Sequence, residues 1–262
     1  MLLVVDVGNT NIVMGVFDGD TVQHHWRIRT ERHTTEDEFS VLVAGLFAQN
    51  SITFQAISKT VISCVVPPMV PILDNFCCKY LGHAPHWIDA KSYPGMHIRG
   101  KNPNEVGADR IVNAVGGYHR YQCSLIIIDF GTATTFDAIS AKGDYMGGAI
   151  SPGIGISAEA LFANASKLPR VDIYKPPATV VGQDTISCIQ SGIIFGYAGL
   201  VDGIVQRMKT EMGAPPPKVI ATGGLAPLLQ NVATSIEVVE PDLTLIGLRI
   251  ISQSLFEKFL VS

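Results

Sequence analysis

The sequence predicts an α/β protein built from two related halves. The first observation behind this prediction is an internal repeat, in which residues 2–11 align with residues 125–134 and Asp6 falls on Asp129. The offset is 129 − 6 = 123 residues, nearly half of the 262-residue chain, so the repeat indicates a duplicated domain rather than a solenoid period. The second observation is that each copy opens a run of strands, after which helix and strand alternate.

Composition supports a folded chain with a sizeable core. Apolar residues make up 47% of the sequence and charged residues 16%, which argues against disorder. The formal net charge is −4 and no Lys/Arg cluster stands out, so no nucleic-acid partner is expected. Asp6 interrupts the first apolar run, which has no basic segment before it, so no signal peptide is expected. No apolar stretch approaches the roughly 18 residues of a transmembrane helix, so no membrane association is expected.

The cysteines and histidines indicate no metal site or disulfide framework. The five cysteines are odd in number and show no C-x-x-C spacing, which favours free thiols in a reducing cytosol. The predicted localisation is therefore cytoplasmic. The seven histidines show none of the spacings that metal sites use.

In the first half, apolar runs predict strands at 2–5 and 12–17, with a turn at Asp18-Gly19. Thr35 and Glu38 form a capping box that opens a helix. The elements predicted after this turn are a helix from Thr35 to about Gln49, a strand at 60–66, a helix at 69–81, a short strand at 86–89, an irregular loop at 92–104 and a helix that opens at Gly107–Arg110.

In the second half, the repeated hairpin is followed by a turn-rich stretch at Gly147–Gly155. The boundary is expected near residues 116–123, which gives domains 1–118 and 119–262. The glycines of residues 185–212 indicate close helix packing, with a hinge as the alternative. The further elements are a helix at 157–165, a loop at 167–181, one long helix or two abutting helices at 185–212, a strand at 218–222, a short helix at 225–229, a strand at 236–239 and a helix at 243–259.

The two Asp-x-Gly turns are typical of a phosphate site that also holds a cation. A carboxylate at a strand tip can bind a cation or its waters, while turn amides and hydroxyls bind phosphate oxygens. Two duplicated turns would face each other across a cleft and bring Asp6 and Asp129 to one polyphosphate. The structural alternative is a hairpin whose Asp only caps its turn. The neutral donors would be Asn9, Thr10, Asn11, Thr132, Thr134 and Thr135.

Two further segments could serve the same chemistry. Gly223 and Gly224 follow a strand and would let an adenosine lie against the main chain, although a strand-to-helix turn uses glycine in any case. Asp109 lies at a predicted helix N-terminus, where the macrodipole favours its ionised form, so it could accept a proton from a substrate hydroxyl. Arg110 could hold an anionic group. The alternative is that Asp109 only stabilises its own helix.

Four motifs follow one another along the chain: Asp6-Val-Gly-Asn-Thr-Asn11, Gly107-Ala-Asp-Arg110, Asp129-Phe-Gly-Thr-Ala-Thr-Thr135 and Thr222-Gly-Gly224. In this order and spacing they resemble the type III pantothenate kinase family. The resemblance covers essentially the whole chain, and the combination of the Gly-Ala-Asp-Arg element with both Asp-x-Gly turns is specific. Asn102-Pro103, Glu105-Val106, Ser151-Pro-Gly-Ile154 and Asp242-Leu-Thr-Leu245 also fit it.

The resemblance implies two ribonuclease-H-like halves of the actin-like ATPase type, each with a mixed sheet flanked by helices. It implies ATP-dependent phosphorylation of pantothenate, the first step of coenzyme A biosynthesis, by a homodimer. Asp109 would accept the proton, Asp129 would bind potassium or ammonium, and Asp6 would serve the ATP-bound Mg²⁺, directly or through water. The ATP contacts would be Asp6, Val7, Gly8, Asn9, Thr10, Asn11, Ile12, Val13 and Thr132, with Gly223 and Gly224 at the adenosine; the substrate contacts would be Gly107, Ala108, Asp109, Arg110 and Thr185.

One departure concerns the substrate loop. Many relatives carry a Tyr just before Asn-Pro, where this chain has Gly100-Lys101. Other functions compatible with such a fold are a different small-molecule kinase or phosphatase, and a non-catalytic accessory transcription regulator. Retention of Asp6, Asp109 and Asp129 argues against a regulator, which could have lost any of them.

Overall fold

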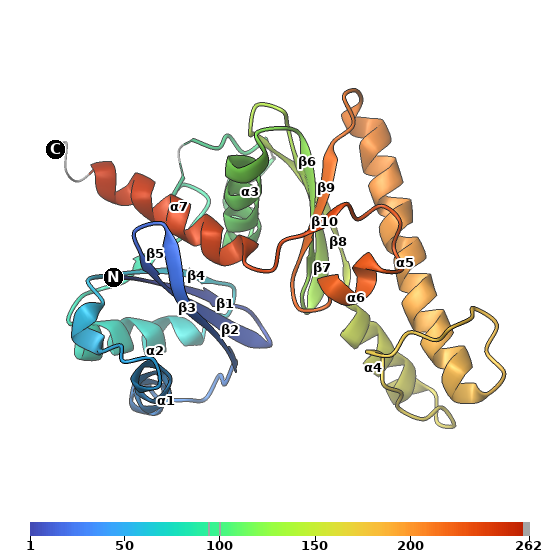
Figure 1. Ribbon diagram of the computed structural model, residues 1–262, viewed down its shortest axis with the longest axis horizontal. Coiled ribbons are helices and arrows are strands. Elements are labelled where there is room, and N and C mark those ends of the chain that lie inside the picture. The colour runs from blue at the N-terminus through green and yellow to red at the C-terminus, as the bar shows by residue number, and fades with distance from the viewer. Residues whose placement is uncertain (94, 100, 259–262) are drawn as a thin grey trace. The chain divides into compact units, whose positions relative to one another are not determined.

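A computed structural model of the protein describes residues 1–93, 95–99 and 101–258 (Figure 1). Its contacts divide the chain into two compact units. Unit 1 comprises Met1–Met96, Lys101–Gly116 and Leu243–Ser262, and unit 2 comprises His97–Gly100 and Gly117–Asp242. A single boundary therefore does not separate the units, because the chain passes between them more than once.

Unit 1 is built on a mixed five-stranded sheet of order β3-β2-β1-β4-β5. The first three strands form consecutive antiparallel hairpins, whereas β4 and β5 continue the sheet in parallel with β1. Gly19, with φ +55°, turns the chain from β2 into β3. The strands are β1 (Leu2–Val7), β2 (Asn11–Asp18), β3 (Thr21–Arg29), β4 (Lys59–Cys64) and β5 (His86–Trp87).

Helices cover both faces of this sheet. Alternate residues of β1, Leu3 and Val5, join a buried cluster with side chains of α1 (Glu36–Ala48) and α2 (Met69–Phe76). The opposite face is covered by α7 (Leu243–Lys258), since a Cβ on Gly15 would touch both Val4 and Leu245. The predicted capping box is present at the start of α1, where Thr35 and Glu38 bond reciprocally.

Unit 2 repeats the same sheet, strand for strand. Its order is β10-β9-β6-β7-β8, in which β6, β7 and β8 are antiparallel neighbours and β9 and β10 run parallel to β6. The predicted α/β fold with a duplicated domain is therefore confirmed. The strands are β6 (Leu125–Phe130), β7 (Ala133–Ile139), β8 (Tyr145–Pro152), β9 (Lys218–Thr222) and β10 (Val238–Val239).

The helices of unit 2 include the longest in the chain, α5 (Thr185–Met212). By length and composition α5 could cross a membrane, but Ile194, Val201 and Val205 are buried in the core of unit 2. A helix that packs in the core of a globular domain can have the same length and apolar composition. The other helices are α4 (Ile154–Asn164) and α6 (Ala226–Gln230), while α3 (Ala108–Tyr121) begins in unit 1 and ends in unit 2.

Three expectations about these elements differ from the structure. The turn-rich stretch predicted at Gly147–Gly155 is largely the strand β8, because pairing with β7 outweighs its glycine content. The helix predicted at 69–81 changes to a π-helix at Cys77. The packing role expected for the α5 glycines is wrong within the described chain, since a Cβ at Gly192, Gly196 or Gly199 would meet nothing within 4 Å.

The predicted domain boundary after residue 118 lies close to the division at Gly116, but the last helix is grouped differently. Residues 243–262 were expected in the second domain, whereas their contacts place them in unit 1. The reason is the apolar face of β1 and β2, which α7 covers.

Close contact between α3 and α7 in unit 1 gives a stability prediction. A Cβ on Gly247 would lie 2.1 Å from the carbonyl oxygen of Val112, so Gly247→Ala must push the two helices apart. We expect a loss of about 1–3 kcal/mol in the free energy of unfolding. Both tryptophans of the chain, Trp26 and Trp87, lie in unit 1, so urea denaturation followed by tryptophan fluorescence reports this change.

The matched control is Gly45→Ala in the exposed middle of α1, where a Cβ would meet nothing within 4 Å. There we expect a gain of about 0.5–1 kcal/mol, because alanine is the better helix former. Equal effects of the two substitutions would contradict the close approach of α3 and α7.

Candidate functional site

The first Asp-x-Gly turn follows the central strand of unit 1. Asp6 is opposite Val13 on β2 and Ser63 on β4, and it is half-buried, whereas Val5 and Val7 on either side of it are buried. The turn closes when the Gly8 N–H donates to the carbonyl oxygen of Asn11, at 3.0 Å. Strand alternation therefore brings the Asp6 side chain out of the core that its neighbours enter.

Thr30, directly after β3, braces this turn. Its N–H donates to the Thr10 carbonyl at 3.0 Å, and its hydroxyl donates to the Gly8 carbonyl at 2.6 Å. Sequence reasoning missed Thr30, because a Thr that begins a polar loop carries no distinguishing signal. Only the pairing of β3 with β2 places it beside residues 8–10.

The second turn occupies the equivalent position in unit 2. Asp129 is opposite Thr135 on β7 and Thr222 on β9, which reproduces the pairing of Asp6. The turn closes through the Gly131 N–H, which donates to the Ala133 carbonyl at 3.1 Å. Thr132 is exposed at its tip. The repeat seen in the sequence is thus a repeat of strand pairing, although the second turn closes one residue earlier than the first.

Two glycines let other segments approach the second turn. Gly223 has φ +90°, and a Cβ there would lie 2.6 Å from Asp129 Oδ1 and 2.6 Å from the Phe130 carbonyl oxygen. Asp129 and Gly223, both predicted site residues, are therefore in contact. Gly153, which lies in the Ser151–Ile154 stretch that fits the family, has the same role before α4, since a Cβ there would lie 2.3 Å from the Thr132 carbonyl oxygen. Gly224, next to Gly223, is exposed.

Two of the hydroxyls expected to be phosphate donors are already engaged in unit 2. Thr134 is 1% exposed, and its Oγ1 lies 2.5 Å from the Tyr197 hydroxyl. The Thr135 hydroxyl donates to Asp137, at 3.3 Å. The expectation that Thr134 is a phosphate donor is wrong, because alternation along β7 turns it into the core.

The Gly107–Arg110 element begins α3. Asp109 Oδ1 accepts a hydrogen bond from the Arg110 N–H at 2.9 Å. Burial raises the pKa of Asp109, and the hydrogen bond and the positive charge of Arg110 oppose that shift without cancelling it. Glycine at position 107 leaves room for the Asp109 side chain, since a Cβ there would lie 2.5 Å from Asp109 Oδ1. A carboxylate with a raised pKa at a helix start is well suited to accept a proton.

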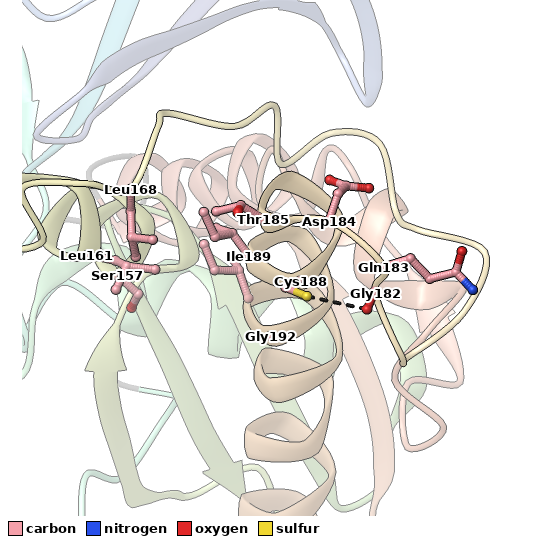
Figure 2. A pocket seen from close by; sticks show the side chains of 11 residues that line it. Ser157, Leu161, Leu168, Gly182, Gln183, Asp184, Thr185, Cys188, Ile189 and Gly192 are labelled. Carbon is pink, nitrogen blue, oxygen red and sulfur yellow. Dashed lines mark hydrogen bonds between the residues drawn. The ribbon is translucent and has the colours of Figure 1, made fainter.

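Thr185 lies on the rim of a pocket in unit 2 of about 780 Å³ (Figure 2). It is the first residue of α5, directly after the helix cap Asp184. Figure 2 shows side chains of α4 on one side of the pocket and the first turns of α5 on the other. The lining residues are Ser157, Leu161 and Leu168, then Gly182, Gln183, Asp184, Thr185, Cys188, Ile189, Gly192 and Ile193.

The predicted site residues thus form two sets. Residues 6–13 and 107–110 belong to unit 1, whereas Asp129, Thr132, Thr185 and Gly223-Gly224 belong to unit 2. That the two sets face each other stays a prediction. Gly100, in the substrate loop where the sequence departs from the expected Tyr, lies outside the described residues.

Solved structures share this fold at low sequence identity. Component A of (R)-2-hydroxyglutaryl-CoA dehydratase from Acidaminococcus fermentans matches with a TM-score of 0.60 and 14% identity, covering 98% of both chains. An inorganic polyphosphate/ATP-glucomannokinase from Arthrobacter sp. strain KM matches with a TM-score of 0.52 and 14% identity, covering 97% of this chain and 98% of the other. These likenesses support the actin-like ATPase and sugar kinase fold.

Sequence comparison identifies the family. The sequence model of the type III pantothenate kinases matches residues 2–207. A relative from Desulfatibacillum aliphaticivorans, named type III pantothenate kinase, is 65% identical over 251 residues, which cover 96% of this chain and 97% of the relative. With similarity of this degree along nearly the whole of both sequences, the chain belongs to the type III pantothenate kinase family.

Proposed function

We propose that this protein transfers the γ-phosphoryl group of ATP to the hydroxyl of pantothenate, giving 4'-phosphopantothenate and ADP. This reaction would be the first step of coenzyme A biosynthesis, in the cytoplasm, carried out by a homodimer. Family membership supports the proposal from the sequence side. The observation that carries it in the structure is Asp109, a half-buried carboxylate with a raised pKa in the Gly-Ala-Asp-Arg element.

In the proposed reaction, Asp109 orients the pantothenate hydroxyl and accepts its proton as the new O–P bond forms. The bond between the γ-phosphorus and the ADP oxygen breaks, and ADP leaves with that electron pair. Phosphoryl transfer passes through a loose transition state, so orientation and charge matter more than base strength. Gly107, Ala108, Arg110 and Thr185 would contact pantothenate, with Arg110 paired to an anionic group.

The nucleotide would be held by the two turns. Residues 6–13 and Thr132 would contact its phosphates, and Gly223-Gly224 would leave room for the adenosine. The engagement of the Gly8 and Thr10 carbonyls by Thr30 supports this assignment, because it fixes the conformation of the first turn. A turn held in its binding conformation loses less entropy when a ligand binds.

The residues at the turns also fit the implied cations. Among the described residues no group of three or more His, Cys, Asp or Glu could hold a metal, so a closed protein cage is not indicated there. Mg²⁺ bound to a nucleotide needs only one or two carboxylates beside phosphate oxygens and water, which half-buried Asp6 could provide. Asp129 and the Phe130 carbonyl both border Gly223, an all-oxygen pair suited to potassium or ammonium. Such cations would neutralise charge on the phosphates.

The function is tested by coupled detection of ADP with pantothenate, ATP, Mg²⁺ and potassium, using Asp109→Asn as the matched inactive variant. We expect the parent to release ADP only when pantothenate is present. The variant should lose about 10²–10⁴-fold in kcat, because the amide cannot accept the proton. Asp172→Asn, a surface substitution in unit 2, should retain parental activity. Release of ADP with a sugar but not with pantothenate would contradict the proposal.

The raised pKa of Asp109 predicts the acid side of the pH profile. The proton acceptor must be ionised, so kcat/KM should fall as pH falls through the pKa of Asp109. Because burial raises that pKa, the midpoint should lie above the ordinary value of 3.8. The residual activity of Asp109→Asn should lack this limb. An identical limb in the variant would assign the titration to another group.

Asp129→Asn should weaken activation by potassium while leaving the fold intact. The amide keeps the shape that Gly223 approaches closely but removes the negative charge that would attract the cation. Initial rates across a potassium series, with choline holding the ionic strength constant, measure the effect. A potassium dependence equal to that of the parent would place the cation elsewhere.

A further inference from the structure

Arg32 is a second contact between the segment after β3 and the first turn. Its Nη2 donates to Asn9 Oδ1, at 3.0 Å. Together with the two hydrogen bonds of Thr30, this contact joins residues 30–32 to each of the turn residues Gly8, Asn9 and Thr10. The Arg32 guanidinium therefore lies at the edge of the turn assigned to the nucleotide phosphates.

Positive charge is otherwise missing from that turn. Residues 6–13 contain no Lys, Arg or His, and Asp6 adds a negative charge. A nucleoside triphosphate brings further negative charges, which a single Mg²⁺ neutralises only in part. Arg32 is exposed, and so is Arg29, which is opposite Asn11 in the sheet. Electrostatics thus favours a phosphate at this edge.

The Arg32 guanidinium retains binding capacity. It has five N–H donors, and the bond to Asn9 uses one of them. Among the described residues no carboxylate lies within ion-pair distance of it. A planar guanidinium with donors to spare matches the geometry of phosphate oxygens.

Unit 2 shows that bracing such a turn does not require an arginine. There the N–H of Gly153, directly after β8, donates to the Thr132 carbonyl at 3.1 Å, as the Thr30 N–H does to Thr10. That brace is a hydrogen bond between backbone groups. The guanidinium in unit 1 is therefore an addition to the shared architecture, and its bond to Asn9 fixes where it lies.

We propose that Arg32 binds the phosphate chain of the nucleotide, with Asn9 holding its guanidinium in place. This inference rests on the proposed function only in taking ATP as the ligand of the first turn. Because Asn9 Oδ1 accepts from Arg32, the Asn9 amide group is oriented as well, with its NH₂ group on the side away from that bond.

The test measures binding of Mg-ATP and of adenosine by calorimetry, without pantothenate, in the parent and in Arg32→Gln. We expect the Kd of Mg-ATP to rise about 10-fold to 100-fold, the range for loss of a charged hydrogen bond. Adenosine, which has no phosphate, should bind both proteins equally. Arg32→Lys should recover part of the ATP affinity, since it restores the charge but not the planar fork.

The matched control is Lys142→Gln, which removes one positive charge from the exposed turn at the opposite end of β7 from Thr132. It should leave both dissociation constants unchanged. An unchanged Kd for Mg-ATP in Arg32→Gln would overturn the inference, and so would an equal loss of affinity for adenosine, which would indicate a damaged fold. Failure to bind ATP in the parent would overturn it together with the proposed function. A parent that binds ATP but does not phosphorylate pantothenate would refute only the proposed function.

Discussion

Burial of the central strand on both faces is the constraint on which the rest of each unit depends. In unit 1, β1 sends Leu3 and Val5 toward α1 and α2 and Val4 toward α7. A strand covered on both sides must be apolar along its length, so its first polar side chain can emerge only where the cover ends. Asp6 occupies that position, and Asp129 does so on β6. The core that stabilises each sheet thereby determines where along the central strand a charged side chain can reach the surface.

The second Asp-x-Gly turn depends on two glycines of neighbouring segments, which lack the side chains that would collide with it. Gly223 and Gly153 each leave room for a backbone carbonyl of the second turn that a single methyl group would fill. The cost is conformational freedom in the unfolded chain, about 0.5–1 kcal/mol per glycine relative to alanine. In exchange, Gly223 lies close to both Asp129 Oδ1 and the Phe130 carbonyl oxygen.

Much of this arrangement could be predicted from the sequence. The periodicity of apolar residues located nearly every helix and strand, and the recurrence of the Asp6 motif at Asp129 predicted the duplication. Both signals can be read from short stretches of sequence. Signals that depend on tertiary packing were missed. The strand β8 was expected to be a turn-rich stretch, and Thr134 was expected to donate to phosphate although its side chain is buried beside Tyr197. Thr30 and Arg32 were overlooked because their importance comes from sheet register, which a single sequence does not display.

The interleaving of the two units has a consequence for synthesis of the chain. Residues 97–242 contain all of unit 2, whereas unit 1 needs residues 243–262 in addition to its N-terminal part. Domains generally fold as units while the chain is made from its N-terminus. Unit 2, although second in the sequence, is therefore the first to have all its residues available on the ribosome. Until α7 emerges, the Val4 and Gly15 face of the first sheet lacks its cover, and the nascent chain exposes an apolar surface on which chaperones can act.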